Sequence, residues 1–314
     1  MRPSDFGALA LMGALWGASY LFIRVGVADF GPVPLMAGRV ALAALVLWIA
    51  LRVAGRQVAV RPYIGRLLFM GLFNAALPFT LIAFAELDLN ASLVAVLGAT
   101  VPLFGAIIGA IWLKDRVTPV RGAGLLLGMA GVAVLTGFSP VTLDRTALLG
   151  IGATLVASLS YAVAGFYAKR KLAGIPAGTL ALGQQLGALA WLAIPALFMT
   201  PSVSPSAGAM GALAGLAILS TALAFVLFFR MIERIGPVRT QTVTYIVPAF
   251  GMLWGALFLG ERITGGMLAG FGLILVSMLM VNQLTLDLWS RRGTGRSAAR
   301  VRWATGHRFG PRTG

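Results

Sequence analysis

Apolar residues are grouped along this chain into long continuous runs, and short polar or charged segments separate one run from the next. Each run is about 20 residues long, the length that a helix needs to cross the hydrocarbon core of a bilayer. A transmembrane β-barrel would instead show segments of about 10 residues with alternating polarity. The pattern predicts ten membrane-spanning helices: Phe6–Val27, Pro34–Leu51, Ile64–Ala85, Ala91–Leu113, Val120–Phe138, Leu148–Ala168, Ala177–Met199, Ala209–Phe229, Thr240–Gly260 and Gly265–Leu286.

A long segment of the first half recurs in the second half. Residues 101–124 read VPLFGAIIGAIWLKDRVTPVRGAG and residues 247–270 read VPAFGMLWGALFLGERITGGMLAG, with 11 identities at an offset of 146 residues. A duplicated half in an apolar chain is typical of a secondary transporter. We therefore predict two copies of a five-helix unit, residues 1–144 and 145–289, and a basic, disordered cytoplasmic tail at 290–314.

The composition requires a lipid environment. Hydrophobic residues make up 59% of the chain and charged residues only 11%, whereas soluble domains carry about 25% charged residues. The chain has no cysteine, which excludes disulfides, thiolate metal sites and cysteine nucleophiles. The one histidine, His307, lies in the polar tail, so histidine acid–base chemistry within the membrane is not expected.

The positive charges predict the orientation of the spans. With the N-terminus inside, 21 of the 25 Lys and Arg residues fall on the inner side, while the outer loops hold only Arg145 and Arg262. This asymmetry follows the positive-inside rule and predicts that both termini are cytoplasmic, in a cell inner membrane. Five spans per copy is an odd number, so the second copy is predicted to cross the membrane inverted relative to the first, with a site between them at the midplane.

Short motifs in both halves resemble one known group of membrane proteins. The motifs are WGASY at residues 16–20, Pro34 with Arg39, TALAF at 221–225, YIVP at 245–248 and LGERIT at 259–264. In their order and spacing the chain resembles the EamA-type members of the drug/metabolite transporter superfamily, over roughly residues 5–286. The first copy departs from the pattern, because it reads Leu113-Lys114-Asp115-Arg116 without the Gly-Glu pair.

That resemblance implies a function. It implies an exporter of small organic metabolites, such as amino acids, that works by alternating access around a cavity lined by the first, third, fourth, sixth, eighth and ninth spans. Two other readings stay open: a non-transporting receptor or assembly protein, and a membrane enzyme that acts on lipid headgroups. The sequence shows no paired acids, His/Asp pair or metal-ligand cluster, so we expect neither catalysis nor a bound metal.

Prolines and glycines recur at matching places in the two copies. Pro102 and Pro248 lie within the fourth and ninth spans, where each removes one helical hydrogen bond. These helices are expected to bend there, either to line the pathway or as packing kinks filled by a neighbouring hydroxyl. GxxxG spacings in the fourth, fifth, ninth and tenth spans predict close helix packing. In the fifth and tenth spans the contact lies either within the monomer or between the subunits of a homodimer.

A set of polar and aromatic residues within the spans forms the candidate substrate site. Arg39 lies about 7 Å below the outer boundary and could bind a substrate carboxylate bidentately, snorkel to the headgroups, or pair with Asp29 or Glu86. Amides and aromatic rings either select the solute or serve packing. The candidate substrate-binding residues are Trp16, Tyr20, Arg39, Asn74, Tyr161, Gln184, Thr244 and Tyr245.

No motif for a nucleotide or other cofactor is present. None of the three lysines follows a GxxxxG run, so ATP is not expected to drive the protein directly. All nine acidic residues lie at span ends, in loops or at the base of the tail, and Glu86 is the best candidate for proton coupling. The seven tail arginines either bind anionic lipid or simply fix orientation. Nucleic acid is not an expected partner.

Overall fold

The chain folds into helices joined by turns. The computed structural model describes residues 2–112, 118–138, 144–199 and 204–281, and these residues contain no strand. The first half contains α1 (Pro3–Phe30), α2 (Pro32–Val53), η1 (Arg61–Tyr63), α3 (Ile64–Gly71), η2 (Leu72–Ala76), α4 (Leu77–Ala85), α5 (Ala91–Gly98), α6 (Val101–Trp112) and α7 (Pro119–Gly137). The second half contains α8 (Arg145–Lys171), α9 (Ala177–Phe198), α10 (Ala207–Ala217), η3 (Ile218–Leu223), α11 (Ala224–Ile235), α12 (Pro237–Thr240), η4 (Gln241–Tyr245), α13 (Val247–Leu259) and α14 (Gly265–Val281).

Most of these helices can cross a membrane. Eight helical stretches of the described chain are long and apolar enough to span a bilayer, and α13 and α14 are shorter apolar helices. The predicted all-helical membrane protein with several spans is therefore confirmed. The count of ten crossings and the inverted orientation of the halves stay predictions. The predicted tail at 290–314 lies outside the described residues.

Proline, glycine and short polar residues set the helix ends. Gly31 adopts a φ of 75° between α1 and α2, and Pro32 then begins α2. A positive φ is accessible to glycine without strain, and proline suits the first turn of a helix. Asp144 accepts a hydrogen bond from the Ala147 N–H and caps α8. These local preferences place the turns where the apolar runs end.

Two spans contain π-helical segments at matching places. The segment η2 begins at Leu72 and η3 begins at Ile218, 146 residues later. A π-helical turn breaks the regular hydrogen-bond pattern and occurs frequently at functional sites. The offset that relates the two sequence copies therefore also relates two interruptions of the helical backbone.

The two predicted proline bends coincide with breaks in the helices. Pro102 and Pro248 each occupy the second position of a new helix, α6 and α13. Before each proline a threonine hydroxyl donates to a backbone carbonyl: Thr100 to Leu97 at 2.7 Å and Thr244 to Gln241 at 2.8 Å. The helices of the fourth and ninth spans are thus interrupted just before each proline, and neighbouring hydroxyls satisfy carbonyls of the turns that precede the breaks. The bending of these spans stays a prediction.

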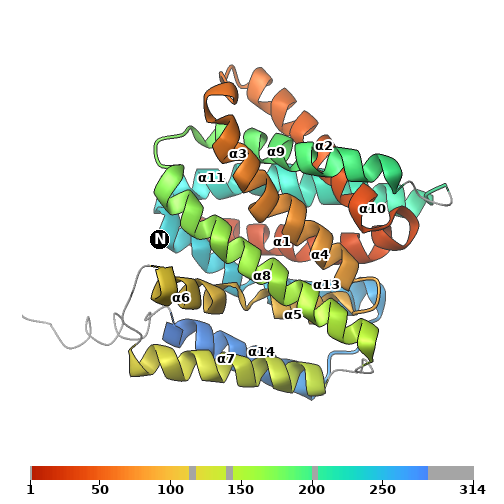
Figure 1. The fold of residues 1–314 in the computed structure, drawn as a ribbon, viewed down its shortest axis with the longest axis vertical. Coiled ribbons are helices and arrows are strands. Elements are labelled where there is room, and N and C mark those ends of the chain that lie inside the picture. The colour runs from red at the N-terminus through yellow and green to blue at the C-terminus, as the bar shows by residue number, and fades with distance from the viewer. Residues whose placement is uncertain (1, 113–117, 139–143, 200–203, 282–314) are drawn as a thin grey trace, which may run out of the picture.

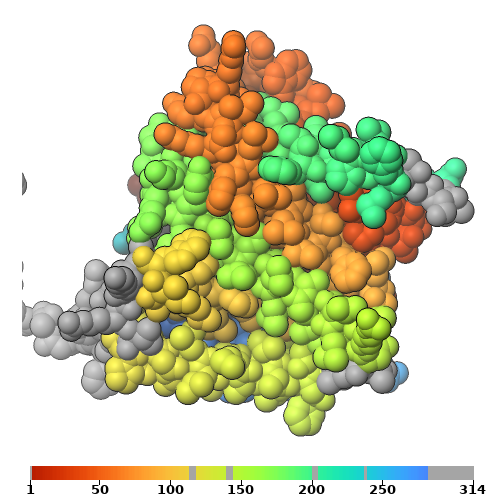
Figure 2. All heavy atoms as spheres, in the orientation of Figure 1, coloured from red at the N-terminus to blue at the C-terminus, as the bar shows by residue number. Residues whose placement is uncertain are grey.

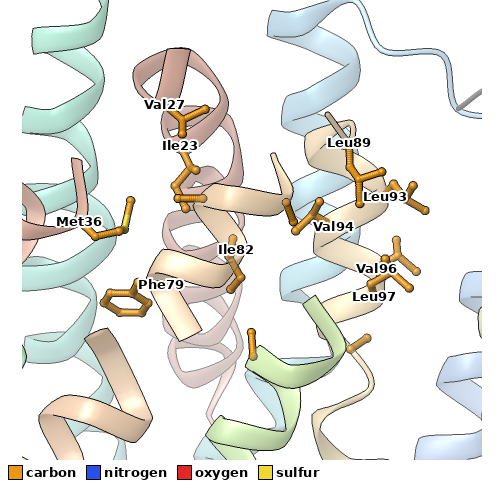
Figure 3. Close-up of a cluster of buried hydrophobic side chains, with 14 of the residues drawn as sticks. Ile23, Val27, Met36, Phe79, Ile82, Leu89, Leu93, Val94, Val96 and Leu97 are labelled. Atoms are coloured by element: carbon orange, nitrogen blue, oxygen red, sulfur yellow. The ribbon is translucent and has the colours of Figure 1, made fainter. Parts of the chain in front are cut away.

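Helices of the two halves are interleaved. The first span, α1, packs on α10 and α13, while its counterpart α8 packs on α4 and α6. Other pairs join α2 with α9 and α7 with α14, and Figure 1 shows the latter two side by side at the lower edge of the molecule. On the face shown in Figure 2, α8 crosses between the α3–α4 region and α7. The main apolar core lies between the halves, and Figure 3 shows side chains of α1, α2, α4 and α5 that meet in it.

Glycines allow α7 and α14 to approach closely. A Cβ atom added at Gly270 would lie 2.7 Å from the Leu135 backbone nitrogen, and one at Gly131 would lie 3.0 Å from the Gly270 carbonyl oxygen. At Gly128, added carbon would lie 2.7 Å from the Ser277 hydroxyl oxygen. The small residues predicted as a packing seam in the fifth and tenth spans therefore meet each other within one chain.

We expect Gly270→Ala to destabilise the protein relative to Gly272→Ala on the same helix. Both changes gain helix propensity of up to about 1 kcal/mol, but only the first introduces a clash, which costs about 1–3 kcal/mol in packed interiors. A Cβ at Gly272 would meet no atom within 4 Å. Thermal unfolding of both variants in the same detergent measures the difference, and equal melting temperatures would contradict the close approach.

Candidate functional site

Arg39 is a buried cation at the interface of the two halves. Its side chain on α2 is only 4% exposed, and its Nε donates to the Thr221 hydroxyl on η3 at 2.9 Å. The guanidinium carbon lies 3.6 Å from the ring centroid of Phe79 on α4, a distance at which a cation is attracted to an aromatic face. Because charge is costly in a membrane without such partners, these contacts hold Arg39 inside the bundle and not at the lipid surface.

Neither of the two acidic residues expected as partners pairs with Arg39: Asp29 bonds to Ser206, and the Glu86 side chain makes no hydrogen bond with the described residues. Within the described part of the chain, neither Asp29 nor Glu86 forms an ion pair with Arg39. The Asp29 carboxylate accepts hydrogen bonds from the Ser206 backbone at 2.8 Å and from the Ser206 hydroxyl at 2.6 Å. No described carboxylate therefore neutralises Arg39, and its planar fork is suited to binding an anionic group of a solute.

Asn74 and Gln184, both predicted site residues, are hydrogen-bonded to each other. The Asn74 Nδ2 on η2 donates to the Gln184 Oε1 on α9 at 2.8 Å. The Gln184 Nε2 is buried and makes no hydrogen bond, and the neighbouring Gln185 is 0% exposed with both amide atoms unpaired. Unpaired buried amides are costly, so these groups form a polar site whose hydrogen-bonding capacity is not filled by the described residues.

The Arg39 and Asn74 contacts are related by the internal repeat. Each joins the π-helical segment of one half to the second span of the other half: η2 to α9 and η3 to α2. Gln185 follows Arg39 by 146 residues, and Ser220 follows Asn74 by the same number. The Ser220 hydroxyl is also buried without a partner. The candidate site is thus built twice, with different polar groups in the two copies.

Two tyrosines border this polar region. The Tyr20 hydroxyl lies against Gly98, where a Cβ would be only 2.7 Å from the tyrosine oxygen. Tyr161 on α8 follows Ser160, whose hydroxyl donates to the Phe73 carbonyl on η2 at 2.7 Å. Both rings pack against the main core, and both lie within electrostatic reach of Arg39. The structure therefore brings Tyr20 and Tyr161 close to the predicted arginine.

The remaining predicted residues lie in different surroundings. Trp16 packs against Phe228 and Phe225, with ring centroids 5.4 Å and 6.3 Å away, in an apolar cluster separate from the main core. Tyr245 packs against the main core, as Tyr20 and Tyr161 do. The Thr244 hydroxyl bonds within its own turn. Three of the four predicted aromatic residues thus pack against the main core, and Trp16 belongs to a separate apolar cluster.

Some contacts at the site were not predicted from the sequence. Phe79, which lies against Arg39, carries no polar group that would mark it as a site residue. Its equivalent at the offset of 146 residues is Phe225, which packs against Trp16. Ser160 precedes Tyr161 as Ser19 precedes Tyr20, but this pattern did not predict the bond from Ser160 to Phe73. Among the described residues no cluster of three or more His, Cys, Asp or Glu side chains could hold a metal ion.

Glu261 of the duplicated motif has a clear structural role. Its Oε1 accepts from the Ala91 N–H at 2.8 Å, and its Oε2 accepts from the Ser92 N–H at 2.9 Å and from the Ser92 hydroxyl. A carboxylate at a helix N-terminus satisfies free N–H groups and the helix dipole. Glu261 therefore caps α5, and its counterpart Asp115 lies outside the described residues.

We expect Thr221→Val to lower the stability of the protein, because it leaves the Arg39 Nε buried without its acceptor. Loss of one partner of a buried polar pair costs about 1–3 kcal/mol. Thr136→Val is the matched control, since among the described residues the Thr136 hydroxyl donates to carbonyls of its own helix, and its cost should stay within about 0.5 kcal/mol. Melting temperatures in detergent test the contrast, and an equal loss in both variants would contradict the role of Thr221.

Comparisons with known proteins agree with this architecture. The model of the EamA-like transporter family matches residues 6–137 and 148–283. A solved crystal structure superposes with a TM-score of 0.65 at 22% identity, over 92% of this chain and 99% of the other. At that identity the match shows a shared fold.

Several relatives have similar sequences over nearly their whole length. "Uncharacterized transporter YoaV" of Bacillus subtilis (strain 168) is 25% identical over 85% of this chain and 92% of its own. "Uncharacterized inner membrane transporter YedA" of Escherichia coli (strain K12) is 27% identical over 88% and 90%. "Probable terminal-alkyne amino-acid exporter" of Streptantibioticus cattleyicolor is 25% identical over 89% and 93%.

Proposed function

Since the chain belongs to the EamA-like transporter family, we propose that it is a secondary transporter that exports small organic metabolites across the inner membrane by alternating access. The observation that carries this proposal is the pair of polar contacts between the halves, Arg39 with Thr221 and Asn74 with Gln184. The first contact is buried and the second is partly buried in an apolar bundle, and unpaired buried amide and hydroxyl groups of Gln184, Gln185 and Ser220 belong to the same segments. Polar groups inside a membrane bundle are typical of substrate pathways.

The chemistry of these groups favours a solute with a carboxylate. Arg39 can present an Nη edge to an anion while its Nε remains bound to Thr221, and the fork geometry of arginine matches a carboxylate. The amides of Gln184 and Gln185 can donate and accept at the same time. Amino acids have this combination of groups, and the name of the Streptantibioticus cattleyicolor relative points to the same class.

Alternating access would use the broken helices. Pro102 and Pro248 begin α6 and α13 after matching breaks, and η2 and η3 interrupt matching spans. Interrupted helices with corresponding positions in two repeats are a mark of transport sites. We infer that the halves rock about the buried polar contacts and expose the site first to one side and then to the other.

The inverted orientation of the halves can be tested by single cysteines, because the chain has none of its own. Ala59 and Ser204 are exposed and lie in equivalent loops of the two halves. In intact cells, we expect Ser204→Cys to react with an impermeant maleimide and Ala59→Cys to react only after the membrane is permeabilised. Reaction of both from the same side would contradict the inversion.

Arg39→Lys is expected to reduce exchange of amino acids by about tenfold or more, because lysine keeps the charge but loses the planar fork. The assay is counterflow in proteoliposomes with a panel of labelled amino acids. Arg52→Lys is the matched control on the same helix, since Arg52 is exposed and its guanidinium carbon lies 5.5 Å from the Trp48 ring centroid, and it should retain wild-type exchange within about twofold.

Two outcomes of this assay would count against the proposal. Equal exchange by the Arg39→Lys and wild-type proteins would remove Arg39 from the binding site. Failure of the wild-type protein to exchange any amino acid, in proteoliposomes shown to be sealed, would contradict amino acids as the substrate class.

The basic tail is a separate proposal: we infer that its arginines contact anionic lipid headgroups.

A further inference from the structure

Glu86 is a carboxylate enclosed in the protein without a partner. It lies at the C-terminal end of α4 and is 0% exposed, and neither of its carboxylate oxygens makes a hydrogen bond with the described chain. Other acidic residues near helix ends accept hydrogen bonds from neighbouring groups. Glu261 accepts three hydrogen bonds and Asp29 accepts two. Glu86 is thus buried without the donors that usually stabilise an ionised carboxylate.

The charged groups around Glu86 do not satisfy its side chain. On α1, the Arg24 guanidinium donates to the backbone carbonyls of Glu86 and Leu87 and so caps the end of α4. Arg39 of α2 and Tyr20 of α1 lie within electrostatic reach, as does the like charge of Glu261 beyond α13. The charged residues at the start of α8, Asp144 and Arg145, are exposed.

An ionised carboxylate is very costly in such surroundings. Burial of an unpaired charge is avoided in proteins, because the group takes up or releases a proton and becomes neutral. A protonated carboxyl group also needs far less stabilisation from the surrounding protein. The apolar surroundings of Glu86 therefore favour its protonated, neutral form over its ionised form.

We propose that Glu86 is a proton-binding site whose occupancy controls the conformational change of the transporter, so that transport is coupled to a proton gradient. This inference rests on the proposed transport function. Glu86 takes a proton from water on the side where it is accessible, forming the O–H bond, and the neutral side chain can then be enclosed. After the change the O–H bond breaks, and the proton passes to water on the opposite side, so one proton crosses in each cycle.

The position of Glu86 links it to the candidate site. Phe79, which carries Arg39 on its ring, precedes Glu86 by seven residues, which is two turns and about 10 Å along the same face of the helix. Side chains seven residues apart lie on one stripe of a helix. The positive charge of Arg39 therefore acts on the Glu86 carboxyl group across the protein, while Glu86 itself need not contact the solute.

Glu86→Gln tests the proposal, because glutamine has nearly the same shape and is permanently neutral. In the first measurement, infrared spectra of the full-length protein in lipid at neutral pH should contain the C=O band of a protonated carboxyl group, and the variant should lack it. Glu261→Gln is the matched control and should retain the band, since the oxygens of Glu261 already accept hydrogen bonds from three donors.

In the second measurement, proteoliposomes are given a mixture of the twenty labelled amino acids with and without an imposed pH gradient. We expect the gradient to change net flux through the wild-type protein several-fold, and to have no effect in the Glu86→Gln variant, whose counterflow exchange continues. Glu86→Asp restores an acid and should restore the response to the gradient.

The outcomes separate this inference from the transport proposal. A gradient response retained by Glu86→Gln, or an infrared band present equally in both proteins, would overturn the role of Glu86 and leave transport intact. If the wild-type protein exchanges none of the amino acids, the proposed substrate class fails, and the infrared comparison alone decides whether Glu86 holds a proton. Loss of exchange in both the Gln and Asp variants would also overturn the proposal, because it would show a structural requirement for Glu86.

Discussion

A guanidinium enclosed by apolar helices must find its partners within the protein, because lipid offers none. Arg39 on α2 donates to a hydroxyl on η3 and lies over an aromatic ring on α4. This one side chain therefore connects α2 to a helix of its own half and to a segment of the other half. The second such link, from Asn74 to Gln184, runs in the opposite sense between the halves. These two directional contacts help to fix how one half lies against the other, because the apolar packing between them is less directional.

The interrupted helices supply the geometry that these contacts need. In η3 the Thr221 hydroxyl donates to the Leu216 carbonyl, five residues earlier, at 2.8 Å, and at the same time accepts from Arg39. A regular helix would engage that carbonyl with a backbone N–H four residues later. The π-helical turn therefore frees a backbone oxygen and gives the threonine both a donor and an acceptor role. The π-helical segment η3 and the buried charge of Arg39 thus depend on each other through Thr221.

Much of the architecture could be predicted from the sequence because the responsible forces are local or periodic. The length of the apolar runs predicted spanning helices, and Pro102 and Pro248 marked the breaks before α6 and α13. The offset between the copies also marked Asn74 and Ser220 as equivalent. These features depend on backbone hydrogen bonding and on hydrophobicity, both of which are written into short stretches of sequence.

The partners of the polar residues could not be predicted in the same way. Asn74 and Gln184 were both candidates, but their hydrogen bond depends on how helices from different halves cross. Trp16 and Tyr20 lie one turn apart on α1, yet Trp16 meets α11 while Tyr20 meets Gly98 at the end of α5. The burial of Glu86 likewise depends on neighbouring helices and not on its own segment. Tertiary packing decides these contacts, and the patterns in a single sequence contain little information about that packing.

The cap that Glu261 forms on α5 has a mechanical consequence. Gly260 ends α13 in the left-handed conformation with a φ of 65°, and the next residue immediately grips the first N–H groups of α5. Because both carboxylate oxygens accept hydrogen bonds, the contact resists rotation of one helix end against the other as well as their separation. The C-terminal end of α13 and the N-terminal end of α5 are therefore mechanically coupled. A tilt of α13 is expected to move the start of α5 with it, so neither helix can change its orientation independently of the other.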